Sequence, residues 1–247
     1  MALGASFAGA RAMVGTSGGG FDLMTEALSL QGMSEIPLVV YLGQRGGPST
    51  GLPTYTMQSD LDLALRAGHG EFPRVVIAPG DPTEVVENTN EAFYLSQKFN
   101  CLSIILSDKH LAEEEYSTTK IPKKSLPVVV TRKVPGEKGF VVKANSYEHD
   151  EYGLTTEDAE ITVKNANRRL EKYKKIKQEC KKFEMIKIHG RKNSKNLIVA
   201  WGSTKGAIID AIQGLDFKFL QVIYMKPLSD KIKEELEKAK NIILIEN

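Results

Sequence analysis

Cysteine is scarce in this sequence. Among 247 residues there are only Cys101 and Cys180, which lie far apart and outside any CxxC motif. A disulfide framework, an iron–sulfur cluster and a structural zinc site all need ligand clusters that this spacing does not offer. We therefore expect no metal site within this chain, so any metal chemistry must come from partner chains.

Long apolar runs and an excess of one charge are also missing. No stretch reaches the roughly 20 apolar residues that cross a bilayer, and the start lacks the pattern of a signal peptide. The 33 basic and 31 acidic residues nearly balance, at a net charge of +2. Such a balance carries no nucleic-acid signature. We expect a cytoplasmic protein with no membrane and no nucleic-acid partner.

What is present is an ordinary apolar share of 41%, enough for one large or two modest domains. Short β-rich runs alternate with helical patterns, which predicts an α/β fold with a parallel sheet. The predicted strands are residues 13–15, 37–42, 74–78 and 102–106, and the predicted helices are 2–12, 21–30 and 82–99, the last with Asp81 as its N-cap.

The loop QRGGPSTGLPT, residues 44–54, follows the second predicted strand, whose residues 37–42 read as buried. It combines Arg45 with hydroxyls and several glycines, so backbone N–H groups and a guanidinium can approach an anion. This composition fits a carboxylate or phosphate site. A tight turn with a solvated arginine is an equally good reading of the composition alone.

A second glycine-rich turn, TSGGG at residues 16–20, follows the first predicted strand, which also reads as buried. Consecutive glycines between a strand and a helix let the backbone approach a ligand. A close crossing of helix and strand would explain the glycines as well, and the Walker lysine and the GxGxxG spacing are both missing. Because ligands sit at the carboxyl ends of parallel strands, we expect both loops on one rim.

The pattern loosens over residues 112–156, with one β-rich patch at 126–133. Here His149, Asp150 and Glu151 suggest a metal site, but three adjacent residues do not face one ion from a regular element. We favour a loop that packs between domains.

Residues 157–188 have helical spacing and predict one long amphipathic helix, broken at most once. Its polar face could bind a negatively charged partner, although a plain solvated face is the simpler reading. That face carries Arg168, Arg169, Lys174, Lys175, Lys177, Lys181 and Lys182.

The rest of the chain predicts a βαβαβ unit with a second parallel sheet and no catalytic residues. Ser203 or Thr204 is the expected N-cap of its first helix. The predicted strands are residues 197–201, 219–224 and 242–245, and the predicted helices end near residues 212 and 238.

Five segments together resemble one family, the α subunits of 2-oxoacid:ferredoxin oxidoreductases. The resemblance is strongest to the 2-oxoglutarate type (2-oxoglutarate synthase), and it covers most of the chain. The segments are TSGGGF at 16–21, LMTE at 23–26, QRGGPSTGLPT at 44–54, QSDL at 58–61 and VVKANSYEHDEYG at 141–153.

The resemblance implies a subunit of an oxidoreductase that uses thiamine diphosphate to decarboxylate a 2-oxoacid, reduces ferredoxin and releases an acyl-coenzyme A. It implies a β subunit that binds the diphosphate and Mg²⁺, and iron–sulfur clusters in partner subunits, none in this chain. Pyruvate or a branched-chain 2-oxoacid is an alternative substrate to 2-oxoglutarate. A non-catalytic assembly paralogue is the alternative in a different class.

Site residues carried over from the family lie in the two glycine-rich loops. The resemblance implies that Arg45 binds the substrate carboxylate, and a bidentate arginine would orient such a planar anion. The substrate-binding residues expected on this basis are Arg45, Gly46, Gly47, Ser49 and Thr50, and the residues expected at the cofactor are Thr16, Ser17, Gly18, Gly19 and Gly20.

The chain departs from the family in two respects. Gly19 stands where the family usually has proline. The family's acid that hydrogen-bonds the aminopyrimidine, and a substrate-contacting threonine, have no counterpart here, and neither Glu26 nor Glu35 lies in the right motif to replace that acid. We therefore expect no complete catalytic set in this chain and an incomplete sequence, an expectation supported by an opening helix that has no start signal.

The resemblance implies a pyrimidine-binding-type domain followed by a transketolase C-terminal-like α/β domain. We expect the first over residues 1–120, with its N-terminal part missing, and the second over residues 191–247, truncated at its end. Residues 121–190 would form the connection and the long basic helix.

Overall fold

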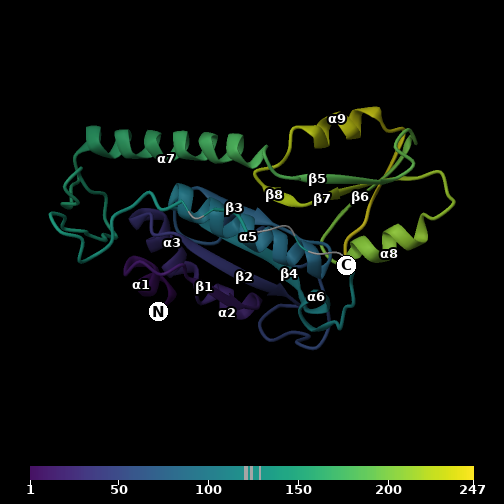
Figure 1. The fold of residues 1–247 in the computed structure, drawn as a ribbon, viewed down its shortest axis with the longest axis horizontal. Helices are drawn as coiled ribbons and strands as arrows, with labels where there is room; N and C mark the ends of the chain where they lie inside the picture. The colour runs from purple at the N-terminus through teal and green to yellow at the C-terminus, as the bar shows by residue number, and fades with distance from the viewer. Residues whose placement is uncertain (120–121, 123–124, 128) are drawn as a thin grey trace.

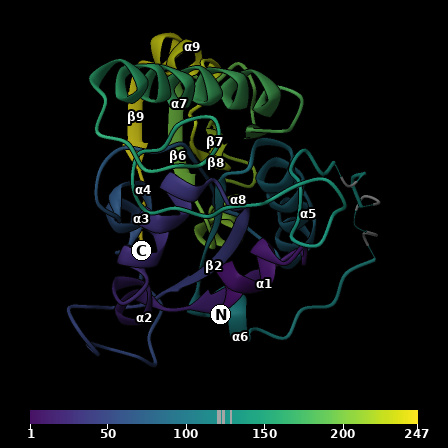
Figure 2. The same cartoon turned by 90° about the vertical axis from the view of Figure 1, so that its left-hand side faces the viewer.

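Two β-sheets lie side by side, and a long helix runs along one side of the molecule (Figure 1). This computed structural model describes residues 1–119, 122, 125–127 and 129–247. A view turned by 90° shows helices α7 (Ala159–Cys180) and α9 (Lys231–Lys238) on the same side, above the sheets (Figure 2). The predicted α/β fold class is confirmed.

The first sheet has the strand order β1-β2-β4-β3-β8. Strands β1 to β4 are parallel, and β8 joins β3 in the antiparallel sense. All four predicted strands of the N-terminal half are confirmed in position. The bounds are β1 Met13–Thr16, β2 Leu38–Gln44, β3 Arg74–Ile77, β4 Leu102–Asp108 and β8 Tyr224–Lys226.

Strand β1 is an edge strand, so the prediction that it is buried was wrong. Met13 and Gly15 are exposed, and Val14 and Thr16 are half-buried. In the part of the chain that the structure describes, β1 pairs only with β2. A three-residue apolar run does not distinguish an edge strand from a central one.

Helices cover the first sheet. Helix α5 occupies Pro82–Phe99, as predicted, and the Asp81 side chain caps it by accepting from the Glu84 N–H at 2.8 Å. The single helix predicted at residues 21–30 is two helices, which meet at Leu23 and Met24. The remaining bounds are α1 Ala2–Phe7, α2 Gly18–Asp22, α3 Thr25–Ser34, α4 Leu61–Arg66 and α6 Lys109–Glu113.

The second sheet has the order β5-β7-β6-β9. Strands β6, β7 and β9 are parallel, as predicted, whereas β5 is antiparallel to β7. Because residues 186–190 form β5, the long helix does not reach residue 188, and this prediction was wrong. The helix ends at Cys180. The bounds are β5 Ile186–Gly190, β6 Asn196–Trp201, β7 Lys218–Val222, β9 Asn241–Leu244 and α8 Thr204–Ala211.

The apolar run at residues 219–224 serves both sheets, which the sequence pattern did not predict. Strand β7 ends at Val222 in the second sheet, and β8 begins at Tyr224 in the first. Between them, the Ile223 carbonyl accepts from the Ala78 N–H at 2.7 Å. One apolar cluster runs from Val40 and Ile104 of the first sheet to Leu197 and Leu220 of the second, so the two sheets share a core.

The connection between α6 and α7 has no helix or strand among its described residues. The β-rich patch predicted at 126–133 forms no strand there, and its residue 128 lies outside the described residues. An isolated bridge joins His149 to Thr155. Ser203 precedes α8 as predicted, but its side chain makes no cap hydrogen bond; the Thr204 hydroxyl instead donates to the Trp201 carbonyl at 2.8 Å.

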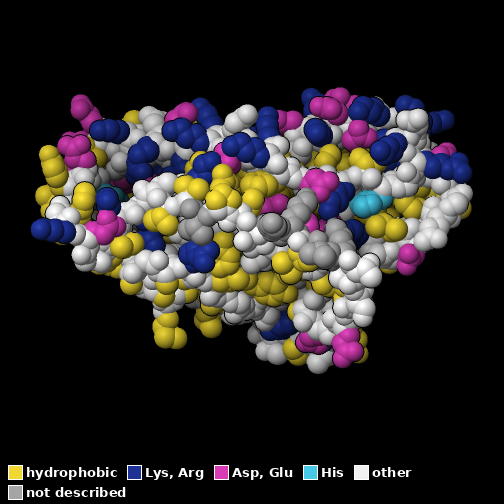
Figure 3. Space-filling view, in the orientation of Figure 1, with side chains coloured by type: hydrophobic (Ala, Val, Ile, Leu, Met, Phe, Trp, Pro, Cys, Tyr) yellow, Lys and Arg dark blue, Asp and Glu magenta, His cyan; other side chains and the backbone are white. Residues whose placement is uncertain are grey.

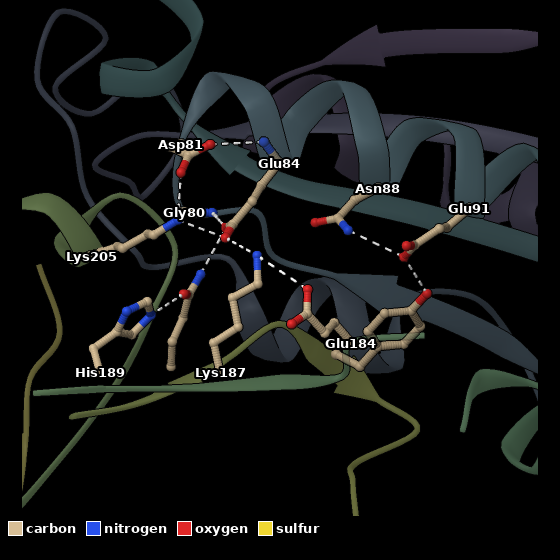
Figure 4. A network of polar contacts seen from close by, with 11 residues as sticks. Gly80, Asp81, Glu84, Asn88, Glu91, Glu184, Lys187, His189 and Lys205 are labelled. Atoms are coloured by element: carbon tan, nitrogen blue, oxygen red, sulfur yellow. Dashed lines mark hydrogen bonds and ion pairs between the residues drawn. The ribbon is translucent and has the colours of Figure 1, made fainter. Parts of the chain in front are cut away.

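A buried polar network joins α5 to the second sheet (Figure 4). Glu84 is 1% exposed and accepts hydrogen bonds from Lys187 of β5 at 2.8 Å, Lys205 of α8 at 2.6 Å and Gln221 of β7 at 2.7 Å. The Gly80 N–H donates to it as well, at 2.8 Å. Burial opposes ionisation of Glu84, but the hydrogen bonds from Lys187 and Lys205 outweigh it and lower its pKa to about 2.

Candidate functional site

Both glycine-rich loops lie on one rim of the first sheet. Strands β1 and β2 are parallel neighbours, with Thr16 opposite Leu42, and each loop leaves its strand at the carboxyl end. The Arg45 Nε donates to the Ser17 Oγ at 3.1 Å, so the loops are in direct contact. The predicted meeting of the two loops is confirmed.

The half-buried Arg45 side chain is held in place from two sides. Besides the bond to Ser17, its Nη1 donates to the Thr50 carbonyl, while the Ser59 hydroxyl donates to the Arg45 carbonyl at 2.9 Å. In the described residues no ion pair joins Arg45 to a carboxylate. Nη2 and the second hydrogen of Nη1 thus remain available for a planar anion.

Two glycines, Gly46 and Gly51, allow the loop that carries Arg45 to fold back on itself. The buried Gly46 accepts from the Leu52 N–H at 2.9 Å, and Gly51 has φ +50°. A Cβ at Gly51 would lie 2.1 Å from the Gly46 carbonyl oxygen, so only glycine fits there. Gly47, Ser49 and Thr50 are exposed on the outside of this turn. Thr50 reaches Arg45 through its backbone, and the roles of the Ser49 and Thr50 hydroxyls stay predictions.

Contacts within the protein explain two of the three glycines of the first turn. A Cβ at Gly18 would lie 3.1 Å from both carboxylate oxygens of Asp60, and one at Gly20 would lie 1.9 Å from the Thr16 Oγ1. The contact of Gly20 in α2 with Thr16 in β1 is the close approach of helix and strand that formed the alternative, whereas Asp60 lies at the start of α4. At Gly19 the nearest described atom to an added Cβ, outside its own helix, is the Ser49 carbonyl oxygen, at 3.8 Å. Gly19 is therefore the position of the turn with room beside the Arg45 loop.

Asp60 belongs to this site although sequence reasoning assigned it no role. Its N–H donates to the Gln44 Oε1 at 3.1 Å, and its Oδ2 is buried without a partner among the described residues. Burial raises the pKa of Asp60, Asp22 raises it further, and Arg45 opposes the shift. The only sequence signal was its place in the QSDL segment.

The fit of this rim to a thiamine cofactor is partial. The half-buried turn at residues 16–20 offers hydroxyls and backbone groups, and Gly19 leaves space, so it suits contact with one side of an organic ring. Among the described residues, no group of three His, Cys, Asp or Glu side chains could hold a metal ion. The turn therefore fits one wall of a cofactor site.

Residues 149–151 lie in a loop, as predicted, whereas the packing of this loop between domains stays a prediction. Asp150 Oδ1 accepts from the N–H groups of Tyr152 and Leu154, both at 2.9 Å, and His149 Nδ1 lies 3.0 Å from the Tyr147 carbonyl. The polar atoms of Asp150 thus stabilise the turn itself.

The basic face of α7 is largely paired within the chain. Cations gather along this helix (Figure 3), but Glu35 pairs with Arg168 at 2.8 Å and Lys172 at 2.7 Å, and Asp230 pairs with Lys177 at 2.8 Å and Lys181 at 3.2 Å. Arg169, Lys174 and Lys182 also have acidic partners. This pairing favours the solvated-face reading over a docking site.

A comparison with protein families decides the family of the chain. The family described as "Pyruvate flavodoxin/ferredoxin oxidoreductase, thiamine diP-bdg" matches residues 1–185. The chain belongs to this family. The resemblance drawn from the sequence segments and the thiamine-diphosphate-binding fold type are thereby confirmed.

Similar proteins agree with this assignment. The chain is 36% identical to the 2-oxoacid:ferredoxin oxidoreductase subunit alpha of Saccharolobus solfataricus, over 99% of this chain and 43% of the relative. It is 29% identical to the 2-oxoglutarate synthase subunit KorA of Methanocaldococcus jannaschii, over 99% of this chain and 71% of that subunit. The chain thus spans less than half the length of the Saccharolobus relative.

A solved structure matches the whole chain. This is the 2-oxoglutarate:ferredoxin oxidoreductase of Magnetococcus marinus with 2-oxoglutarate, coenzyme A and succinyl-CoA bound, at a TM-score of 0.88 and 30% identity over 99% of this chain and 47% of that one. In the described residues, no helix is both long and apolar enough to cross a membrane.

Proposed function

We propose that this chain is part of a thiamine-diphosphate-dependent oxidoreductase that decarboxylates a 2-oxoacid, passes the electrons to ferredoxin and releases an acyl-coenzyme A. The observation that carries the proposal is the placement of Arg45. Ser17 and the Thr50 carbonyl hold its guanidinium at the carboxyl ends of the parallel strands, and its remaining N–H groups can bind an anion. Membership of the family supports it.

Arg45 has the task of orienting the substrate. A guanidinium that is fixed on two sides binds a carboxylate with set position and rotation, so the keto carbon is presented in one direction. Gly46 and Gly51 keep the loop closed, while Gly47, Ser49 and Thr50 line its outer turn. A lysine would supply the charge without the orientation.

The turn at residues 16–20 would contact the pyrimidine end of thiamine diphosphate. When bound, this cofactor supplies the nucleophilic carbon and stabilises the charge left by decarboxylation. In line with the family resemblance, a β subunit would hold the diphosphate and Mg²⁺, and other subunits would carry the iron–sulfur clusters. The active site would then lie between chains, and we place the assembly in the cytoplasm.

2-Oxoglutarate is the favoured substrate. Support comes from the similarity to the KorA subunit of Methanocaldococcus jannaschii and to the Magnetococcus marinus enzyme. Pyruvate or a branched-chain 2-oxoacid is the alternative, because Arg45 reads only the carboxylate that all three share. A non-catalytic assembly paralogue is the third candidate.

The decisive experiment is co-expression with the neighbouring subunit genes. The purified complex is assayed for viologen or ferredoxin reduction with 2-oxoglutarate, pyruvate and a branched-chain 2-oxoacid, each with coenzyme A. We expect the highest kcat/KM with 2-oxoglutarate. Equal or higher kcat/KM with pyruvate would reject the substrate assignment, and a complex that binds thiamine diphosphate but reduces no acceptor with any 2-oxoacid would favour the non-catalytic paralogue.

A further inference from the structure

A hollow of about 770 Å³ lies between α7 and the connection from α4 to β3. Residues on one face of α7, among them Leu170 and Tyr173, form one wall. Arg66, Phe72 and Arg74 lie on the other wall, and Lys226 of β8 completes it. One acid, Glu71, also lines this wall among the cations. The volume is within the range of about 300–1,000 Å³ that is typical of small-molecule sites.

The hollow lies at the end of the sheet where the parallel strands begin, and Arg45 lies at the opposite end, where they finish. Arg74 begins β3 and is in register with Leu102 and Leu38, the first residues of β4 and β2. Arg45 follows Gln44, at the far end of β2. At about 3.3 Å per residue along β2, the two ends of the strands are roughly 20 Å apart. The hollow is therefore separate from the proposed substrate site.

Arg74 is a buried cation without an acidic partner. It is 2% exposed, donates to the carbonyls of Ala64 at 3.2 Å and Ala67 at 2.6 Å, and lies 4.3 Å from the centre of the Phe72 ring. Its Nε is buried without a hydrogen-bond partner, and no ion pair to a carboxylate is present among the described residues. A buried charge left in this state is costly unless a further group compensates it.

Lys226 adds a second cation that lacks an acidic partner. It is half-buried, and its only hydrogen bond in the described part of the chain goes to the Leu65 carbonyl at 3.4 Å. Burial lowers the pKa of Lys226, repulsion from Arg74 lowers it further, Glu71 opposes these effects, and Arg66 adds a smaller lowering. The hollow is thus electropositive, and an anion would relieve this repulsion.

Two further cations line the hollow, but both have acidic partners. Arg66 contacts Asp62 at 3.4 Å, with both side chains about four-fifths exposed, and Arg169 pairs with Glu148. An exposed pair such as Arg66–Asp62 is weak, so Arg66 is free to turn toward a ligand.

The α7 wall is apolar and aromatic. Leu170 is 55% exposed although it faces the hollow, and the half-buried Tyr173 lies one turn further along the same face. An aromatic side chain beside a cluster of cations suits a ligand that has both a flat ring and a strongly charged group.

We propose that this hollow binds a phosphate-bearing ligand of nucleotide size, with the phosphate beside Lys226 and Arg66, above Arg74, and the ring against Tyr173 and Leu170. The several converging cations favour phosphate over a single carboxylate, which one arginine would satisfy. The site is independent of the 2-oxoacid chemistry, so it stands or falls separately from the proposed function.

The test measures ADP binding to the assembled complex by isothermal titration calorimetry. The titration is run both without and with saturating coenzyme A, because coenzyme A carries an adenosine diphosphate group that could compete for the same hollow. Inorganic phosphate serves as the probe that lacks a ring. Lys226→Gln removes the charge, and Leu170→Glu places a carboxylate in the hollow at an exposed position where folding is little affected. Lys175→Gln, an exposed cation of α7 outside the hollow, is the control.

We expect saturable ADP binding that weakens about tenfold or more in both variants. Lys226→Gln loses a hydrogen bond from a charged group to the phosphate, and Leu170→Glu places a carboxylate that repels the phosphate. Lys175→Gln should bind ADP as the unaltered complex does. Phosphate alone should bind more weakly than ADP.

Three results would overturn the proposal. One is the absence of saturable ADP binding at millimolar concentration. Another is an equal loss of binding in Lys175→Gln, which would indicate nonspecific attraction. The third is protection of Lys226 from acetylation in the complex when no nucleotide is present, since the hollow would then be the seat of an acidic segment of a partner protein.

Discussion

Arg45 and Ser17 are joined by a hydrogen bond of 3.1 Å from the arginine Nε to the serine Oγ, across 28 residues of chain. One residue comes from the loop assigned to the substrate carboxylate and the other from the turn assigned to the cofactor. The contact fixes the guanidinium plane relative to the turn. The two halves of the proposed site are therefore positioned by each other.

Arg45→Lys should raise the KM for the 2-oxoacid in the assembled complex while thiamine diphosphate stays bound. Lysine keeps the charge, but it loses the bidentate fork and the Nε contact to Ser17. The measurement is steady-state viologen reduction together with the cofactor content of the purified complex. Arg191→Lys, at an arginine that is 62% exposed, is the control. Loss of the cofactor in Arg45→Lys would show that the loop binds a different ligand.

Ser17→Ala should raise the same KM about three- to tenfold, because loss of this partly exposed hydrogen bond costs about 0.7–1.4 kcal/mol. The effect should be smaller than that of Arg45→Lys, since the Thr50 carbonyl still holds Nη1. In the double variant the increase in KM, expressed as a free energy, should be smaller than the sum of the two single increases. Full additivity would argue against coupling of the two side chains.

Gly51→Ala should lower kcat/KM for the 2-oxoacid at least tenfold, because the new Cβ would lie 2.1 Å from a backbone oxygen and φ is +50°. The loop that holds Arg45 has to open to accept it. Gly206→Ala, in α8, is the matched control and should keep its activity, because outside its own helix no described atom lies within 4 Å of the added Cβ. A Gly51→Ala complex with unchanged kcat/KM would show that loop closure does not position Arg45.

Glu84→Gln should reduce the free energy of unfolding by about 3 kcal/mol near neutral pH, the equivalent of a pKa lowered from 4.5 to about 2. Since the pKa is lower in the folded state, this stabilisation is present above pH 4.5 and is lost as the pH falls toward 2. Urea unfolding at several pH values measures it. The difference between Glu84→Gln and the unaltered protein should therefore shrink in acid.

The control for this prediction is Glu237→Gln. Glu237 is 65% exposed and lies 3.8 Å from Lys233, so its replacement should change the unfolding free energy by at most about 0.5 kcal/mol at any pH. A pH-independent difference for Glu84→Gln would mean that packing, rather than charge, gives Glu84 its effect.

The thiols of Cys101 and Cys180 should resist alkylation in the folded protein. Both are buried; burial raises the pKa of Cys101 to about 12 and that of Cys180 above its usual range. Since the thiolate is the reactive form, iodoacetamide should label neither site until urea is added. Peptide mapping by mass spectrometry measures the labelling. Rapid labelling of the native protein would contradict the burial of both side chains.

Much of the fold could be predicted because local signals agree with the tertiary structure. Helix α5 has a capping aspartate, a proline in its first turn and regular spacing, and its predicted bounds were right. The failures lie where spacing is ambiguous. Residues 186–188 continue a helical pattern but pair with β7, and residues 219–224 divide between two sheets. Such choices depend on partners far away in the chain.

The sequence by itself determined the alternation of strands and helices, the family and the placing of Arg45 and the glycine turn at strand ends, because periodicity, capping and motif order are local properties. Only the tertiary structure decided that Ser17 contacts Arg45, that Asp60 lies against Gly18, and that Glu84 is buried between three elements of the second half. These contacts join residues many positions apart, and their energies depend on distance and burial, which the order of residues along the chain does not specify.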